Sequence, residues 1–170
     1  MMSNLIMSWS KCSIEIGKTG ANDAMAAALT DVGTIKDKST TLESAEGEKL
    51  EAKASGGVLV AQEESEGTIT LTTRIIEPDF AFLASLLGAE HDAAKKELKV
   101  STLIVPDSYS VKLTPKNIGG TGIKIRKAHV TYKEGHSEEE GMYGDLTFTI
   151  MACADGELYT KFKKEAPVSE

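Results

Sequence analysis

The sequence predicts a mainly β fold: an antiparallel β-sandwich or barrel with one flanking α-helix at about residues 78–87 and a long polar hairpin arm at about residues 43–62. Three observations support this prediction. Apolar and polar residues alternate along most of the chain, β-branched residues are frequent within the alternating runs, and glycines mark the turns between them. Such strands have one polar face, which is typical of antiparallel sheets with one side in water.

Four segments carry the strongest strand signal, because alternation and β-branched residues coincide there. They are residues 68–75, 109–114, 123–132 and 146–151. In the first of them, Leu71 and Ile75 fall on one face, whereas Thr70 and Thr72 fall on the other. Weaker strand signals lie at residues 13–16, 32–36, 48–54, 57–62, 98–105 and 158–162.

One segment has helical periodicity instead. Pro78 and Asp79 suit the first turn of a helix, and Gly88 suits its end. The apolar stripe expected to face the core consists of Phe80, Leu83, Ala84 and Leu87. We expect this helix to cover an open end or face of the sheet. The alanine-rich residues 24–29 carry a weaker signal for a second, shorter helix.

The chain length is that of one domain, which we place at residues 1–170, with an N-terminal arm at 1–11 and a C-terminal tail at 163–170. Of the 170 residues, 41% are hydrophobic, which is enough to form a core. The apolar runs are far shorter than the roughly 20 residues of a membrane helix, and the first residues lack the pattern of a secretory signal. Because of these short apolar runs, we expect no membrane insertion. Cys12 and Cys153 are isolated, which fits a reducing compartment.

Charge is segregated along this acidic chain, whose formal net charge is −7. Residues 43–66 hold seven Glu and two Lys, and residues 134–145 hold five acidic residues and no Lys or Arg. Between them, residues 95–133 hold nine basic residues and two acidic ones. This pattern disfavours tight binding of nucleic acid and fits association of the acidic face of one copy with the basic face of another. Solvated loops of mixed sign are the alternative explanation.

No motif in the chain predicts catalysis, a cofactor or a metal site. The triplet Gly17-Lys18-Thr19 resembles the end of a phosphate-binding loop, but Cys12 stands where that loop requires a glycine. The three histidines do not share a metal-ligand spacing, and no nucleophile is paired with a base. We expect a protein that is not an enzyme.

The hairpin arm is the most unusual segment, since it is charged and poor in large apolar residues. Such a hairpin cannot bury much surface against its own domain, so we expect it either to be mobile or to become ordered against a neighbouring molecule. Its candidate contact residues are Glu46, Gly47, Glu48, Lys49, Leu50, Glu51 and Lys53.

The order of elements resembles that of the major tail tube proteins of tailed bacteriophages. The Glu-rich hairpin is followed by the strand Glu66-Gly67-Thr68-Ile69-Thr70-Leu71-Thr72, by Pro78-Asp79-Phe80, and by a helix that ends in Leu86-Leu87-Gly88. The resemblance covers residues 30–90, and the remainder of the chain fits it by strand count. It implies a structural protein that assembles into rings, usually hexamers, which stack into a hollow tube for DNA delivery.

Further expectations follow from that resemblance. Inner sheets of neighbouring subunits would join edge to edge, the hairpin arm would reach an adjacent ring, and DNA would pass transiently down the middle. The partners would be the chain itself and tape-measure, baseplate or tail-terminator proteins. The protein would be made in the cytoplasm of the host bacterium and would reside in the virion tail.

Two sets of residues are candidates for contacts in such a tube. An acidic, lysine-poor wall would let a polyanion slide without being retained, since phosphate contacts hold DNA. The candidate lumen-facing residues are Glu63, Glu64, Glu66, Thr68, Thr70 and Thr72. The candidate charge-complementary interface pairs Lys124, Arg126, Lys127 and Lys133 of one ring with Glu138, Glu139 and Glu140 of another.

Two alternative functions remain open at this stage. The inner-tube proteins of type VI secretion and other contractile injection systems share the ring-forming fold. A monomeric β-sandwich binding module, such as an adhesin or a carbohydrate-binding domain, belongs to another class. Against that class, aromatic residues make up only 5% of the chain, and Trp9, the one tryptophan, lies outside the predicted strands.

Overall fold

The computed structural model describes residues 4–8 and 11–168. Within these residues the chain is mainly β, with one α-helix, as the sequence predicts. The strands are β1 (Cys12–Lys18), β2 (Thr30–Asp31), β3 (Thr41–Ser44), β4 (Lys49–Lys53), β5 (Leu59–Glu64), β6 (Ile69–Ile76), β7 (Glu90–Asp92), β8 (Glu97–Lys99), β9 (Ile104–Pro115), β10 (Thr121–Ser137), β11 (Gly141–Ile150) and β12 (Thr160–Lys163). The helix is α1 (Phe80–Leu87), and a 3-10 turn, η1, spans Ala21–Asp23.

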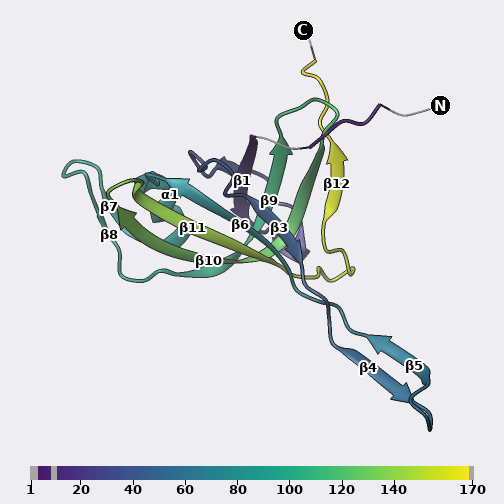
Figure 1. Ribbon diagram of the computed structural model, residues 1–170. Coiled ribbons are helices and arrows are strands. Elements are labelled where there is room, and N and C mark those ends of the chain that lie inside the picture. Colours follow the sequence, from purple (N-terminus) through teal and green to yellow (C-terminus); the bar gives the residue numbers. More distant parts are fainter. Residues whose placement is uncertain (1–3, 9–10, 169–170) are drawn as a thin grey trace.

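One antiparallel sheet organises most of these strands (Figure 1). Its order is β2-β1-β9-β10-β11-β6-β3, and β12 pairs with β10 outside this path. The 17-residue strand β10 changes partners along its length. Its first residues pair with β12, whereas the part from Ala128 onward pairs with β11. The β4–β5 and β7–β8 hairpins each form a separate two-stranded sheet.

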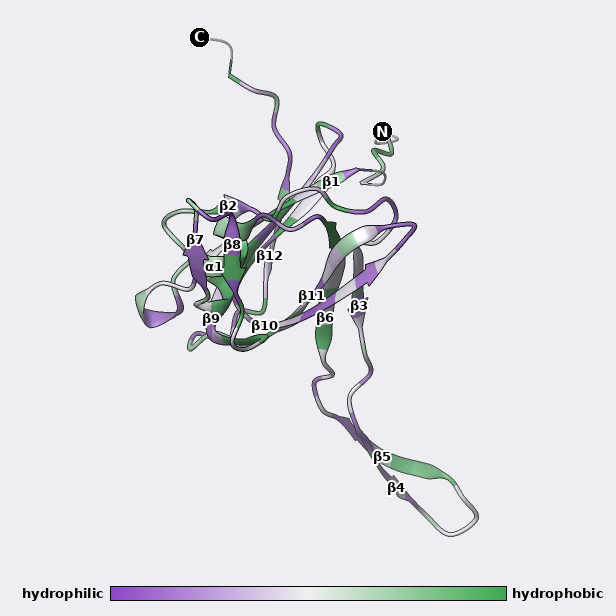
Figure 2. Ribbon diagram, turned by 90° about the vertical axis from the view of Figure 1, so that its left-hand side faces the viewer, coloured by the Kyte–Doolittle hydropathy of each residue, from purple (hydrophilic) through white to green (hydrophobic). Residues whose placement is uncertain are grey.

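The segment between β1 and β3 closes the sheet into a barrel. Its first part, β2, pairs with β1 at one end of the sheet. A few residues later, Ile35 forms a bridge with Ile75 of β6, and the Lys36 amide donates a hydrogen bond of 2.8 Å to the Arg74 carbonyl. The same segment therefore joins both ends of the strand order, and the ribbon curves back on itself (Figure 2).

The core lies inside this barrel. Most of its least exposed large side chains come from five strands and are Ile14, Leu71, Ile75, Val111, Ile125, Val130, Leu146 and Phe148; Val32, after β2, and Leu86 of α1 complete the set. The predicted alternation on β6 is confirmed, since Leu71 and Ile75 are fully buried while Thr70 and Thr72 face outward. Burial of each such apolar side chain contributes about 1.5–3 kcal/mol, which makes this interior the main source of stability.

Helix α1 is confirmed, but the predicted apolar stripe is wrong in part. The buried side chains are Phe82, Leu83, Leu86 and Leu87. Phe80 is 42% exposed and packs edge-on against His91, with 5.9 Å between the ring centroids. The stripe shifts because the helix begins only at Phe80 and ends at Gly88, which adopts the left-handed conformation. With two turns available, the helix buries its centre against β9, where the Tyr109 hydroxyl donates to the Ser85 carbonyl at 3.5 Å.

The second, shorter helix predicted at residues 24–29 does not form. Helical geometry is limited to the turn η1, and the residues after it are extended or bent. The segment lies against β1, where an added Cβ on Gly17 would meet the Ala28 carbonyl oxygen at 2.2 Å. Small alanines fit this close approach, so packing against the strand outweighs their helix propensity.

The chain ends are only partly described. In the predicted N-terminal arm, the Ser8 hydroxyl accepts a hydrogen bond of 2.6 Å from the Thr121 amide. Residues 1–3 and 9–10, with Trp9 among them, lie outside the described residues, as do residues 169–170 of the C-terminal tail. The first residue of that tail, Lys163, belongs to β12. Across the described ranges, no helix combines the length and the apolar character that crossing a membrane requires.

The core position of Phe148 yields a stability prediction. Phe148→Ala removes a fully buried ring and leaves a cavity, so we expect the free energy of unfolding to fall by about 3–5 kcal/mol. Phe80→Ala is the matched control, because the same atoms leave a half-exposed site; there we expect a loss of about 1 kcal/mol or less. Urea denaturation followed by circular dichroism measures both. Equal losses for the two variants would contradict this assignment of the core.

Candidate assembly surfaces

The arm formed by β4 and β5 projects from the barrel between β3 and β6 (Figure 1). Its strands pair only with each other, and every residue of both strands is exposed. Leu50 lies opposite Glu63, and Ala52 lies opposite Ala61, so small apolar side chains gather on one side of the hairpin. Leu50 is 68% exposed and Val60 is 63% exposed. The arm therefore presents apolar surface that none of the described residues covers.

The neck of the arm, which we define as residues 45–48 and 65–67, is tightly packed. A Cβ added to Gly47 would lie 1.6 Å from the Ser65 carbonyl oxygen, and a Cβ added to Gly67 would lie 1.8 Å from the Ala45 carbonyl oxygen. Only glycine lets the two chain segments approach so closely. The Ser65 amide also donates to the Glu48 carbonyl at 2.9 Å, and the Ser65 hydroxyl accepts from the Glu48 amide at 2.9 Å. The neck thus gives the arm a defined direction from the barrel.

The predicted contact residues divide between these two regions. Of the arm candidates, Glu46, Gly47 and Glu48 lie in the neck, and Lys49, Leu50, Glu51 and Lys53 lie on β4. The candidate lumen residues are not brought together. Glu63 and Glu64 lie on β5 of the arm and Glu66 lies in the neck, whereas Thr68 precedes β6 and Thr70 and Thr72 lie on it.

Thr70 and Thr72 belong to a larger polar surface on the outside of β3, β6, β11 and β10. Strand register places Thr72 between Thr41 and Thr147, and Thr131 follows Thr147 on β10. A second row runs parallel to this one, two residues further along each strand, in the order Glu43, Thr70, Thr149 and His129. We call the surface the threonine face; it consists of Thr41, Glu43, Thr70, Thr72, His129, Thr131, Thr147 and Thr149.

Sequence analysis identified only Thr70 and Thr72 of this face. The threonine alternation at Thr147 and Thr149 is the same signal, and it was available in the predicted strand at 146–151. Which strands are neighbours, and in what register, is a long-range property that alternation does not specify. The face could therefore be recognised only from the folded sheet.

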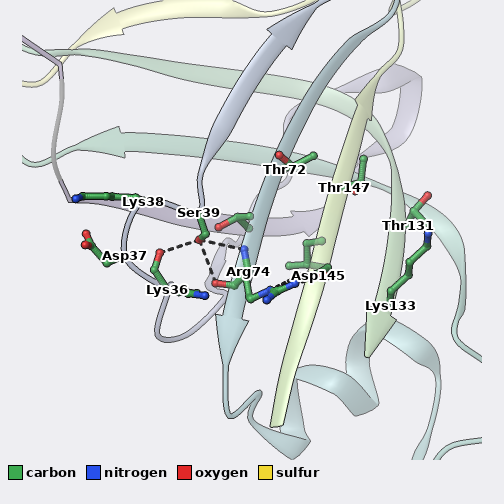
Figure 3. A pocket seen from close by; sticks show the side chains of 12 residues that line it. Lys36, Asp37, Lys38, Ser39, Thr72, Arg74, Thr131, Lys133, Asp145 and Thr147 are labelled. Carbon is green, nitrogen blue, oxygen red and sulfur yellow. Dashed lines mark hydrogen bonds and ion pairs between the residues drawn. The ribbon is translucent and has the colours of Figure 1, made fainter. Parts of the chain in front are cut away.

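A charged cluster borders the threonine face (Figure 3). Arg74 donates to Asp145 at 2.7 Å and to Glu140 at 2.9 Å, and its guanidinium lies 4.0 Å from the centre of the Tyr143 ring. Lys36 also pairs with Glu140. Beside this cluster, an open depression of about 700 Å³ lies between the loop at residues 36–39 and strands β6, β10 and β11.

Two of the basic residues predicted for contacts between rings are paired within the chain. Arg126 lies at a register shift of β10 and forms ion pairs with Asp155 at 2.8 Å and with Glu157 at 2.6 Å. Lys127 pairs with Asp23 at 3.2 Å, and its hydrogen bond is the main reason that the pKa of Asp23 is lowered. These side chains hold the turn after β11 and the turn η1 against β10.

Of the other residues predicted for this interface between rings, Glu140 also forms ion pairs within the chain, with Lys36 and Arg74. Lys124 and Lys133 are exposed and take part in no ion pair among the described residues. Glu138 and Glu139 are exposed at the β10–β11 turn. The part of the predicted interface that remains available to a neighbour is therefore smaller than the sequence suggested.

The Arg126 contacts shift the ionisation of the carboxylates that they bind. The Arg126 guanidinium lowers the pKa of Asp155 by hydrogen bonding. The pKa of Glu157 is lowered first by the Thr160 hydroxyl and then by Arg126. Each shift favours the ionised form in the folded state, so both carboxylates stabilise the fold when they are charged.

The sequence matches no known family model and none of the curated proteins with which it was compared. Among the described residues, no group of three His, Cys, Asp or Glu side chains is placed to hold a metal ion. The functional argument therefore depends on the arm, the threonine face and the charges described above.

The neck yields a prediction about order in the arm. In Gly47→Ala and Gly67→Ala, the new methyl group overlaps a backbone oxygen, so the neck must open. We expect the amide of Ser65 to lose protection from hydrogen exchange by about tenfold or more, with little change in global stability, because the arm contributes nothing to the core. Gly20→Ala is the control, since its methyl group would meet atoms of Ala24 at 3.3 Å. Unchanged exchange in both neck variants would contradict a closed neck.

The lowered carboxylate pKa values yield a pH prediction. A carboxylate with a lowered pKa stabilises the fold fully above its ordinary range, near pH 4, and loses this effect as pH falls through the lowered value. We therefore expect the free energy of unfolding to fall between pH 5 and pH 3, and to fall less steeply in Arg126→Gln. Lys133→Gln, on the same strand, should keep the wild-type slope. Identical slopes for all three proteins, measured by urea denaturation, would rule out this role of Arg126.

Proposed function

We propose that this chain is a structural protein that assembles with copies of itself into stacked rings, forming a hollow tube like the tail tube of a tailed bacteriophage, through which DNA is delivered. The observation that carries the proposal is the arm. An ordered hairpin that exposes Leu50, Val58 and Val60 is unfavourable for an isolated monomer, because that apolar surface remains in water. Docking against a neighbouring subunit removes this surface from water.

The threonine face is the surface that we propose to line the tube lumen. Two rows of side chains on four adjacent strands present hydroxyl groups, one Glu and one His, and no Lys or Arg. The adjoining row, in which Arg74 pairs with Asp145 and Lys133 is exposed, marks the border of this face. Phosphates are retained mainly by Lys and Arg, so such a wall offers DNA little to bind. The candidate lumen set is thereby revised: Thr70 and Thr72 stay in it, and Glu63 and Glu64, on the arm, leave it.

The sheet edge next to the arm supports ring formation. Strand β3 is four residues long, pairs on one side with β6, and is fully exposed. An uncovered edge of this kind presents unpaired backbone groups that another strand can satisfy. In a ring, the edge of each subunit would be paired by the next, which extends the sheet that carries the threonine face around the lumen.

The inner tube of a contractile injection system would use the same surfaces, and the sequence and geometry favour neither tube over the other. The binding-module alternative makes a different prediction, because it requires no contact between copies. Association state therefore distinguishes the two classes directly.

Deletion of the arm tests the proposal. The Ala45 amide donates to the Thr68 carbonyl at 2.8 Å, so an Asn-Gly turn in place of residues 46–67 should close the hairpin and leave the barrel intact. By negative-stain electron microscopy over a concentration series, we expect rings or striated tubes from the full chain and none from the deletion variant. Thermal unfolding serves as the folding control.

Two outcomes would contradict the proposal. A full chain that stays monomeric at every concentration, by sedimentation velocity as well as microscopy, would favour the binding module. Tubes formed equally well without the arm would remove the observation on which the proposal depends.

A further inference from the structure

A cluster of lysines without acidic partners surrounds Phe162 on the outside of β9, β10 and β12. Lys112 and Lys124 lie directly opposite each other on neighbouring strands, where like charges repel. Their amino groups lie 5.5 Å and 5.2 Å from the centre of the Phe162 ring. We call this surface the lysine patch; it consists of Lys112, Lys116, Lys124, Phe162 and Lys164.

The described residues contain no ion pair that neutralises the patch. None of its four lysines takes part in one. Lys164 donates instead to the Lys116 carbonyl at 2.9 Å. Glu15 faces Lys112 in the register of β1, and the two form no ion pair. Attraction to the Phe162 ring offsets part of the repulsion and leaves the net positive charge.

Phe162 is held in place by a glycine. An added Cβ on Gly122 would lie 2.3 Å from the Phe162 ring, so the ring packs directly on the β10 backbone. The patch thus has a fixed, partly buried aromatic centre and a positively charged rim. Binding surfaces on proteins commonly combine such an aromatic anchor with charged groups at the rim.

The arm has the complementary chemistry. Residues 43–66, which include the whole arm, hold seven Glu and two Lys, and one side of the hairpin carries Leu50, Ala52 and Ala61 together with Glu63. An anionic hairpin with an apolar side suits a basic rim around an aromatic ring. Double-stranded DNA would satisfy the lysines, but its bases are stacked on one another and are not free to contact the Phe162 ring, so the arm is the better match.

The position of the two surfaces requires that any contact be between copies. Figures 1 and 2 place the arm at one end of the molecule, and the C-terminal segment that follows β12 toward the other. An arm directed away from the barrel cannot fold back onto its own patch without opening the neck. One copy stacked on another would bring the arm of the first to the patch of the second.

We propose that the lysine patch is the receiving site for the arm of a second copy of this chain. The inference rests on the proposed self-assembly and identifies where the arm binds. It replaces the basic side of the predicted charge-complementary interface: Lys124 remains, Arg126 and Lys127 are withdrawn into internal ion pairs, and Phe162 becomes the centre of the contact.

Zero-length carbodiimide cross-linking of the full chain tests the contact, because this reagent joins a lysine to a carboxylate that touches it. In an equal mixture of ¹⁴N- and ¹⁵N-labelled protein, we expect mixed-isotope peptides joining Lys112, Lys124 or Lys164 to Glu48, Glu63 or Glu64. Cross-links from the arm to other lysines only would overturn the inference.

Charge reversal separates a direct contact from a general charge effect. Lys112→Glu with Lys124→Glu should weaken association about tenfold by sedimentation velocity. Adding Glu63→Lys and Glu64→Lys to the same chain should restore most of it, because both sides are then reversed. Lys95→Glu with Lys96→Glu, on the exposed β7–β8 hairpin, is the matched control and should leave association unchanged.

The outcomes distinguish this inference from the proposed function. Tubes that form with the patch reversed and without arm–patch cross-links would support the tube and overturn the patch. Arm–patch cross-links in small oligomers that never form rings would support the patch and contradict the tube. Lost binding of double-stranded DNA in the patch variant, without cross-links in the wild type, would assign the patch to nucleic acid.

Discussion

The backbone ladder of β10 is the constraint on which the remaining structure depends. This strand pairs with β9 on one edge and with β12 and then β11 on the other, so it connects both parts of the barrel. At the first of its two register shifts against β9, the buried positions pass from Ile125 to Ala128, a spacing of three instead of two. The extra residue bends the strand where its partner changes and keeps the apolar side chains directed inward on both sides of the bend.

The same bulge determines where the outer surfaces lie. Before it, β10 contributes Lys124 to the lysine patch, and after it, His129 and Thr131 to the threonine face. The Arg126 carbonyl at the bulge accepts hydrogen bonds from the hydroxyls of Ser110 at 2.8 Å and Thr19 at 3.0 Å. Backbone groups left unpaired by the irregularity are thus satisfied by neighbouring side chains, which fixes the relative placement of the two surfaces.

Local patterns predicted the elements better than their arrangement. Alternation gave the strands and their inward faces, and Pro78, Asp79 and Gly88 bracketed the helix closely. The pattern could not locate the bulge, because residues 126–127 interrupt an otherwise regular strand and the partner exchange depends on β11 and β12. The misplaced helical stripe and the absent helix at residues 24–29 have the same origin, since tertiary packing outweighed short local signals.

Prediction of the candidate sites followed the same division. The arm was identifiable because a long polar segment without core-forming residues is visible in composition alone. The internal use of Arg126, Lys127 and Glu140 was not, since their acidic and basic partners are distant in sequence. Charge counted along the chain therefore overestimated the charge that is available for intermolecular contacts.

If the arm of one copy binds the lysine patch of the next, a head-to-tail polymer of this protein would be directional. All subunits would point the same way, so one terminus would expose unoccupied anionic hairpins and the other unoccupied cationic patches. The two termini would then grow by different chemical steps. A factor that binds the hairpins exposed at one terminus would not bind the patches exposed at the other, so initiation and length termination would call for two partners of opposite charge.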